Sequence, residues 1–187
     1  PRANVCFLVY CPATYSDARG AALTELHARL VMDLLNETLY LAMMADLEAS
    51  VRSVRTGVEI SVRGYNDKMP ALLAEVLERL ASADLPADRF AVAREELLRD
   101  YADRRVRPLS HAKYERLLCL LNLKWDLKDM TAAVHAATVE TSVEFAKQLF
   151  RGAFVEGFVH GNVVRSGALQ MMELVQRHLC KPALAAA

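Results

Sequence analysis

The sequence predicts an α+β fold, a mainly antiparallel sheet with helices packed on one face, in a single domain over residues 1–180. Three extended segments support this prediction: an apolar run at 5–10, an alternating stretch at 50–63 and a second run at 153–160. Helical periodicity fills most of the sequence between them. At 187 residues and 53% apolar composition, the chain is long enough for one sizeable core.

The first element is a strand at residues 5–10, VCFLVY, which Pro12 ends. Its uninterrupted apolar character indicates that both of its faces are covered. A long amphipathic helix is expected next, from about Arg19 to Leu47, with Asp17 as its N-cap. One side of this helix carries Leu23, Leu26, Leu30, Val31, Leu34, Leu35 and Leu39.

Residues 50–63 alternate between valine or isoleucine and polar side chains, which predicts a β-hairpin with its turn at Thr56-Gly57 and one solvated face. Gly64 is expected to end the second strand. The sequence GYNDK at 64–68 then leads to Pro70, in the first turn of a helix through Leu80.

Five helices are predicted in the remainder. Asp84, ahead of Pro86, is expected to cap a helix that runs through Tyr101. Pro108 opens the next helix, whose apolar side carries Tyr114, Leu117, Leu118 and Leu121. Helices at 127–135 and 139–150 are capped by Asp126, with Asp129 nearby, and by Thr138. After the strand at 153–160, a last helix reaches residue 179, and residues 181–187 form a tail or linker.

The charge balance limits the classes of partner. Lysine and arginine number 23 and so do aspartate and glutamate, so no overall field attracts nucleic acid or an anionic membrane surface. No apolar run approaches the roughly 20 residues that cross a bilayer, and no signal-type segment precedes residue 5. We therefore expect a cytoplasmic protein with no membrane and no nucleic-acid partner. Pro1, in place of an initiator methionine, indicates a piece of a longer chain.

The motifs that carry chemistry are absent or weak. GYNDK lacks the several glycines of a phosphate loop and does not match G-x-x-x-x-G-K-[ST], so a strand-to-helix turn is the favoured interpretation. None of the five histidines occurs in H-x-x-E-H or H-E-x-x-H. His111 and Glu115, one helical turn apart, are expected to be a solvated pair, and His160 a structural residue.

Other reactive groups give no stronger signal. Four cysteines, Cys6, Cys11, Cys119 and Cys180, have no metal-binding spacing and are interpreted as buried or free thiols. No G-x-S-x-G elbow is present. A basic cluster of Arg99, Arg104, Arg105 and Arg107 favours a solvated helix end, with an anion or partner patch as the alternative. We therefore predict no catalytic, cofactor-binding or metal-binding residues, and whether this chain is itself an enzyme stays open.

Four separated stretches carry a family resemblance. They are LNETLYLAMMADL at 35–47, GYNDK at 64–68, RPLSHAKYERLL at 107–118 and VHGNV at 159–163. In this order they resemble the third, middle domain of the pitrilysin or insulinase family of zinc metallopeptidases, in particular its insulin-degrading-enzyme-like (insulysin) members. The likeness covers roughly residues 5–179. One departure is Ala45-Asp46-Leu47, where the family has A-G-L.

The resemblance implies a noncatalytic domain of a larger protease. Family members have four related α/β domains around a chamber; the first binds zinc through H-x-x-E-H and a later glutamate, and the third is usually catalytically silent. The implied function is part of the wall of the substrate chamber of a peptide-degrading zinc metalloendopeptidase. The implied partners are the other domains of the same polypeptide and peptide substrates, and zinc is bound by a different domain. Tyr40 and Tyr65 match family tyrosines and are given packing roles.

Two alternatives remain. The parent could have lost its peptidase activity, which would leave this domain a structural or protein-interaction role. An unrelated α/β scaffold that binds a protein partner is the other. An intact H-x-x-E-H upstream favours the peptidase, and an extensive exposed apolar surface favours a domain cut from a larger protein.

Overall fold

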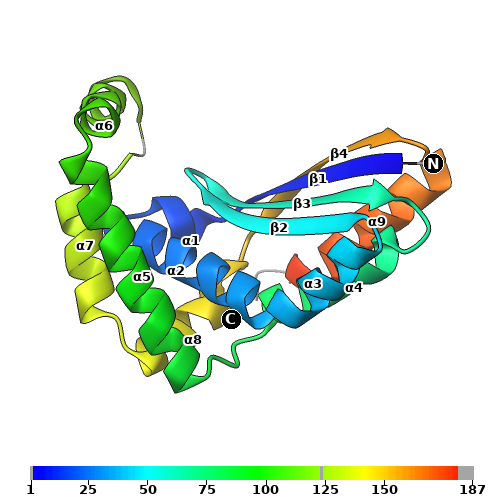
Figure 1. Ribbon diagram of the computed structural model, residues 1–187, viewed down its shortest axis with the longest axis horizontal. Coiled ribbons are helices and arrows are strands. Elements are labelled where there is room, and N and C mark those ends of the chain that lie inside the picture. Colours follow the sequence, from blue (N-terminus) through cyan, green and yellow to red (C-terminus); the bar gives the residue numbers. More distant parts are fainter. Residues whose placement is uncertain (1, 123, 181–187) are drawn as a thin grey trace, which may run out of the picture.

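The computed structural model describes residues 2–122 and 124–180, so the predicted tail at 181–187 lies outside the described residues. Four strands form one antiparallel sheet in the order β2-β3-β1-β4 (Figure 1). The strands are β1 (Arg2–Tyr10), β2 (Leu47–Val54), β3 (Gly57–Tyr65) and β4 (Phe154–Gly161). The helices are α1 (Pro12–Tyr15), α2 (Ala18–Leu34), α3 (Asn36–Met44), α4 (Met69–Ala81), α5 (Ala87–Val106), α6 (Pro108–Leu120), α7 (Leu127–Ala136), α8 (Val139–Leu149) and α9 (Arg165–Leu179). The predicted α+β class is confirmed.

The described helices cover one face of the sheet and leave the other open. Along β1, Val5, Phe7 and Val9 point toward the helices and are almost fully buried, while Leu8 and Tyr10 on the other face are half-buried. The prediction that both faces of this strand are covered is therefore wrong. The apolar side chains on its second face, Leu8 and Tyr10, are instead partly exposed.

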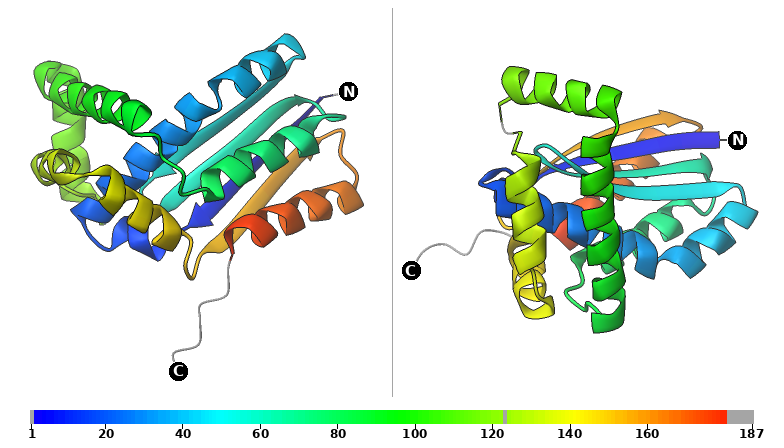
Figure 2. Two further views of the ribbon diagram at one scale, coloured as in Figure 1. Left: turned by 90° about the horizontal axis from the view of Figure 1, so that it is seen from below. Right: turned by 60° about the vertical axis from the view of Figure 1, so that its left-hand side comes forward.

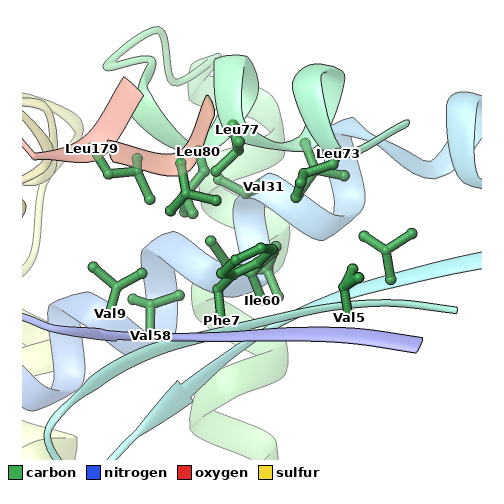
Figure 3. Close-up of a cluster of buried hydrophobic side chains, with 14 of the residues drawn as sticks. Val5, Phe7, Val9, Val31, Val58, Ile60, Leu73, Leu77, Leu80 and Leu179 are labelled. Carbon is green, nitrogen blue, oxygen red and sulfur yellow. The ribbon is translucent and has the colours of Figure 1, made fainter. Parts of the chain in front are cut away.

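The main core lies between the sheet and three helices. Phe7 and Ile60, opposite each other on β1 and β3, belong to one buried cluster with Val31 of α2, Leu77 of α4 and Leu179 of α9 (Figure 3). The sheet and the helices that pack on it form two layers, seen edge-on in Figure 1, and in Figure 2 (left) the helices run alongside the strands. Complete burial of a leucine or phenylalanine side chain stabilises a fold by about 1.5–3 kcal/mol, so this layer contributes the main favourable free energy.

A second core lies beside the sheet, among helices alone. Leu26 and Leu30 of α2 pack with Leu97 and Tyr101 of α5 and Val134 of α7. Helix α2 thus has one side in each core. The helices α5–α8 gather at one end of the sheet (Figure 2), and α2 joins them to it.

Local signals set most element boundaries. Asp17 caps α2 by accepting from the Gly20 N–H at 2.6 Å, and Asp126 caps α7 by accepting from the Lys128 N–H at 2.7 Å. Thr138 begins α8 with a capping box that Thr141 completes. These three predicted caps are confirmed.

Three predicted boundaries are wrong. The hairpin turn expected at Thr56-Gly57 lies at Arg55-Thr56, because Gly57 begins β3 opposite Val54. The long helix expected over 19–47 breaks at Leu35, where φ is −89° and ψ is 0°, and its second part ends at Met44. Asp46 then takes a left-handed φ of 59°, so that Leu47 can begin β2. Asp84 does not cap α5; Pro86 occupies the N-cap position in an extended conformation that directs the chain into the helix.

Within the described part of the chain, no helix combines the length and the apolar character that crossing a membrane requires.

Candidate docking surface

The GYNDK turn joins two distant segments. Gly64 has a φ of 131°, and a Cβ there would lie 2.0 Å from the Asp46 carbonyl oxygen, so only glycine fits. Asn66 donates through Nδ2 to the carbonyl oxygen of Asn162, in the VHGNV segment after β4, at 2.7 Å. The turn therefore ties the end of β3 to the end of β4 and starts α4 at Met69. The predicted strand-to-helix turn is confirmed.

A pocket of about 470 Å³ lies beside this turn. Its lining includes the polar side chains of Asn66, Asn162 and Arg177 and the apolar side chains of Met69 and Leu174. The pocket offers a recess for an apolar side chain with polar contacts at its edge.

The histidines do not come together. His27 is buried in α2, its Nε2 lies 3.0 Å from the Leu80 carbonyl oxygen, and burial lowers its pKa. His111 and Glu115 form the expected solvated pair, Nδ1 to Oε1 at 3.9 Å with both side chains exposed. His160 stacks on Phe158 at the sheet surface. Across residues 2–122 and 124–180, no three His, Cys, Asp or Glu side chains are grouped so as to hold a metal ion.

The four cysteines are free, as predicted. Cys11 is buried, and burial raises the pKa of its thiol to about 12, which keeps it protonated and unreactive at neutral pH. Cys119 is exposed on α6. The absence of a disulfide between Cys6 and Cys11 agrees with their odd spacing along an extended segment.

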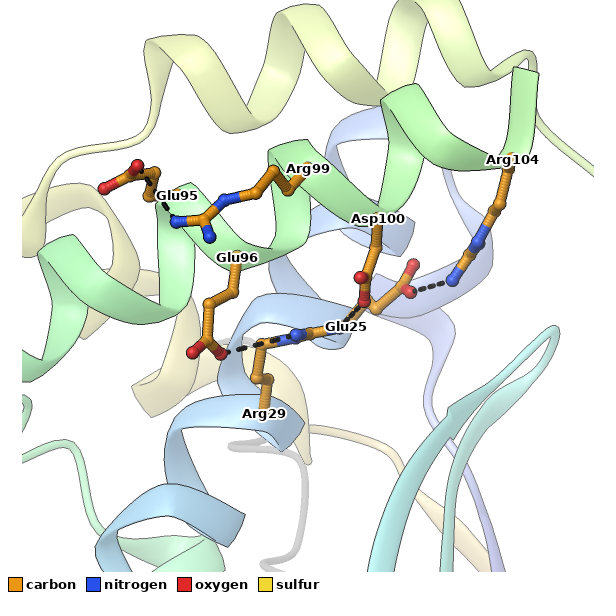
Figure 4. Close-up of polar contacts among 7 residues, drawn as sticks. All are labelled: Glu25, Arg29, Glu95, Glu96, Arg99, Asp100 and Arg104. Carbon is orange, nitrogen blue, oxygen red and sulfur yellow. Dashed lines mark hydrogen bonds and ion pairs between the residues drawn. The ribbon is translucent and has the colours of Figure 1, made fainter. Parts of the chain in front are cut away.

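The basic cluster of α5 takes part in an ion-pair network, drawn in Figure 4. Arg104 contacts Glu25 of α2 at 3.0 Å, and Arg29 of α2 pairs with both Glu96 and Asp100 of α5. Arg99 pairs with Glu95, within its own helix. The prediction of a solvated helix end is therefore only partly right. Ion pairs with Glu25 and Arg29 join this part of α5 to α2. The side chain at position 105 is outside the described part.

The open face of the sheet has two halves of different chemistry. On β2 and β3, Arg52 pairs with Glu59 and Arg63 with Glu48, so this half is charged and internally neutralised. On β1 and β4 the face is largely apolar and aromatic. Its side chains are Asn4, Cys6, Leu8, Tyr10, Phe154, Glu156, Phe158 and His160.

The aromatic half of the open face is solvent-accessible. Phe154 and Phe158 are 61% and 64% exposed. The Tyr10 hydroxyl donates to Glu156 at 2.9 Å and holds that carboxylate against the sheet. Large exposed aromatic side chains in one strip are typical of contact surfaces.

Strand β4 also leaves a hydrogen-bonding edge. The Asn162 N–H donates to the Arg2 carbonyl oxygen at 3.0 Å, so by antiparallel alternation the backbone groups of Val155, Gly157 and Val159 point away from β1. No described strand pairs with that edge. An extended segment from elsewhere can therefore pair there.

Two helices carry further exposed apolar side chains. On α3, Tyr40, Leu41, Met43 and Met44 are all more than half exposed. The packing role expected for Tyr40 is therefore wrong within this chain. Tyr65 is also 43% exposed, and its ring contacts the Arg2 guanidinium, whose Cζ lies 5.4 Å from the ring centroid. Helix α6 projects from the end of α5 (Figure 1) and has no buried residue, although its sequence has an apolar side. These surfaces are what a domain cut from a larger protein should expose.

The chain matches known proteins in sequence. The family model described as the middle or third domain of peptidase M16 matches residues 1–133. The chain is 30% identical to insulin-degrading enzyme of Homo sapiens over 184 residues, 98% of this chain and 18% of that protein. It is 31% identical to a nardilysin-like protein of Arabidopsis thaliana over 180 residues, 96% of this chain and 18% of that protein. It thus spans less than a fifth of the length of these relatives.

The fold also matches solved structures. The crystal structure of pitrilysin superposes with a TM-score of 0.88 at 18% identity, covering all of this chain and 20% of that one. A peptidase M16 inactive domain from Pseudomonas fluorescens superposes with a TM-score of 0.70 at 14% identity, covering 99% of this chain and 47% of that one.

Proposed function

Because the chain belongs to the peptidase M16 family, as a middle domain of the kind found in insulin-degrading enzyme, we propose that it forms one wall of the substrate chamber of a zinc metalloendopeptidase. The single observation that carries this proposal is the uncovered face of the sheet. A sheet with one solvated face is common, but Phe154 and Phe158 make this face suited to contact with apolar peptide side chains.

In this proposal the two kinds of exposed surface have separate functions. The aromatic half of the open face, with the free edge of β4, contacts the peptide substrate. The apolar side chains of α3 and α6 contact the other domains of the same polypeptide, which make up the larger part of the relatives' length.

The chemistry belongs to another domain. Zinc, bound elsewhere in the parent, would polarise the scissile carbonyl and activate a water molecule. This chain's own residues would position and enclose the peptide. We also propose a cytoplasmic location for the parent, supported by four free thiols, because disulfides are rare where the compartment is reducing.

The full-length gene product tests the proposal. We expect it to contain bound zinc and to cleave a fluorogenic peptide, with cleavage lost on chelation and restored by Zn²⁺. The 187-residue chain alone should be inactive. Chelator-sensitive cleavage by the 187-residue chain contradicts the noncatalytic assignment, and a full-length protein without zinc or activity favours a structural role in an inactive parent.

The wall itself is tested by Phe158→Arg in the full-length protein. We expect KM for a long apolar peptide to rise several-fold with little change in kcat, because the substitution removes a peptide contact and leaves the zinc site intact. Val92→Arg is the matched control, since Val92 is also half exposed but lies on α5. Equal effects of the two substitutions, or none from Phe158→Arg, would show that the open face does not meet substrate.

A further inference from the structure

A second pocket lies at the other end of the molecule from the GYNDK turn. It measures about 610 Å³ and is bounded by the β2–β3 turn, α2, the end of α5 and the segment before α7. Its walls include Glu25, Val54, Arg55, Arg104, Lys124 and Trp125. Figure 4 shows one side of it, where Arg104 reaches Glu25. None of these residues belongs to the strip of aromatic side chains on β1 and β4.

Positive charge is in excess in this pocket. Three cations line it, Arg55 from the turn, Arg104 from α5 and Lys124 from the segment after α6, against one carboxylate, Glu25. Glu25 is already engaged, because it accepts from Arg104 at 3.0 Å and from the Tyr101 hydroxyl at 2.7 Å. Arg55 and Lys124 form no ion pair with any carboxylate of the described residues.

The cations are close enough to disfavour one another. The pKa of Lys124 is lowered, first by partial burial and then by the charges of Arg104 and Arg55, which outweigh the opposing effect of Glu25. Lys124 Nζ lies over the ring of Tyr114, 5.1 Å from its centroid, an attraction that holds the ammonium at the pocket wall. A bound anion would remove the repulsion among these like charges.

Trp125 supplies a second and independent observation. Its indole N–H is buried and has no hydrogen-bond acceptor among residues 2–122 and 124–180. A buried donor without an acceptor is rare and costly in folded proteins, and this one belongs to a residue that lines the pocket. Val54, Leu127 and Met130 add an apolar wall to the same pocket.

We propose that this pocket binds a ligand through an oxyanion, a carboxylate or phosphate group, with an apolar portion against Met130 and Leu127. Arg55 and Lys124 pair with the anion, and Trp125 forms part of the wall beside it. The volume suits a small molecule or one or two residues of an acidic peptide. The site does not depend on the chamber-wall function, since it is defined by charges within this chain.

The single tryptophan makes the test specific to the pocket, because Trp125 is the only fluorophore of its kind in the chain. The 187-residue chain is titrated with sodium phosphate and separately with sodium succinate, with ionic strength held constant by sodium chloride. We expect a saturable change in Trp125 fluorescence and a rise in Tm with at least one of the two anions. Phosphate alone indicates a phosphate-bearing ligand, and succinate alone a carboxylate.

Two arginine variants on the same hairpin distinguish loss of binding in the pocket from the general effect of removing one positive charge. Arg55→Ala should raise the Kd about tenfold, because it removes a charge-assisted contact from an exposed turn without disturbing the core. Arg52→Ala should leave the Kd unchanged, since Arg52 pairs with Glu59 on the open face. No saturable response to either anion by fluorescence or Tm, or equal weakening by the two variants, overturns the proposal.

Discussion

Lowering the pH should destabilise the protein through His27. The ring is fully enclosed between α2 and the end of α4, and its Nε2 contacts the Leu80 carbonyl oxygen at 3.0 Å. That contact assigns the proton to Nε2 and leaves Nδ1 buried without a partner in the described chain. Burial, which Arg79 reinforces, lowers the pKa of His27 below its ordinary value of 6.5. Protonation of Nδ1 would therefore place an unpaired positive charge in the core.

Proton linkage gives the direction and the size of the change in the free energy of unfolding with pH. Because the folded pKa lies below the unfolded one, the unfolded chain binds more protons as the pH falls through 6.5, and the free energy of unfolding decreases. While native His27 stays neutral, the loss between pH 7.5 and 5.5 amounts to about 1.4 kcal/mol. Above the unfolded pKa this contribution is constant.

Urea unfolding followed by far-UV circular dichroism at several pH values measures this loss. The control is His27→Gln, whose side-chain amide can donate to the same carbonyl but does not titrate. We expect the variant to lose about 1.4 kcal/mol less than the wild type over the same interval. Parallel pH profiles for the two proteins would refute the reasoning, since the other titrating groups are common to both.

Three further predictions concern single positions. In urea unfolding, Gly64→Ala should lower the free energy of unfolding by about 3 kcal/mol or more, because its Cβ would lie 2.0 Å from a carbonyl oxygen. Gly152→Ala has open space around the new Cβ and should lower it by only about 1–2 kcal/mol. Asp46→Gly should be about 1 kcal/mol more stable than Asp46→Ala in the same assay, because both lose the exposed Arg2 pair but only glycine relieves the left-handed φ of 59°. Ellman's reagent should label Cys119 rapidly in the native protein and Cys11 only on unfolding, since Cys11 is buried and its thiol pKa is about 12.

The outcomes that contradict these predictions are equally specific. Similar losses for the two glycine variants would mean that the crowding at Gly64 is relieved by movement of the chain. Equal stability of Asp46→Gly and Asp46→Ala would mean that the left-handed backbone stores little strain. Labelling of Cys11 before unfolding would mean that this thiol is accessible in the native protein.

Local chemistry made much of the fold predictable. Alternation at 50–63 predicted the hairpin, and Asp17, Asp126 and Thr138 predicted three helix starts, because each cap acts on residues only two or three positions away. The side that each element buries was harder to predict. The two faces of β1 read alike in sequence, and which one meets helices depends on segments up to 170 residues further along the chain, such as α9.

The candidate sites depend on contacts that no local pattern encodes. Asn66 meets Asn162 across 96 positions, and the excess positive pocket combines Arg55 with Arg104 and Lys124 from separate elements. The basic cluster on α5 was visible in the sequence, but its partner Glu25 was not, because a carboxylate on a predicted amphipathic helix looks solvated. The apolar side of α6 predicted that its side chains are buried, but no residue of α6 is buried in this chain.

Helix α2 sits in both cores, with Val31 in contact with the sheet side and Leu26 and Leu30 on the helical side. The stretch from α5 to α8 looks like an insertion between α4 and β4, yet it is not an excisable module. Deleting it would strip one side of α2 and expose leucines that are now almost fully buried. Shortening this domain by removing α5–α8 therefore requires polar replacements on the exposed side of α2, because an unstable α2 would also destabilise the core under the sheet.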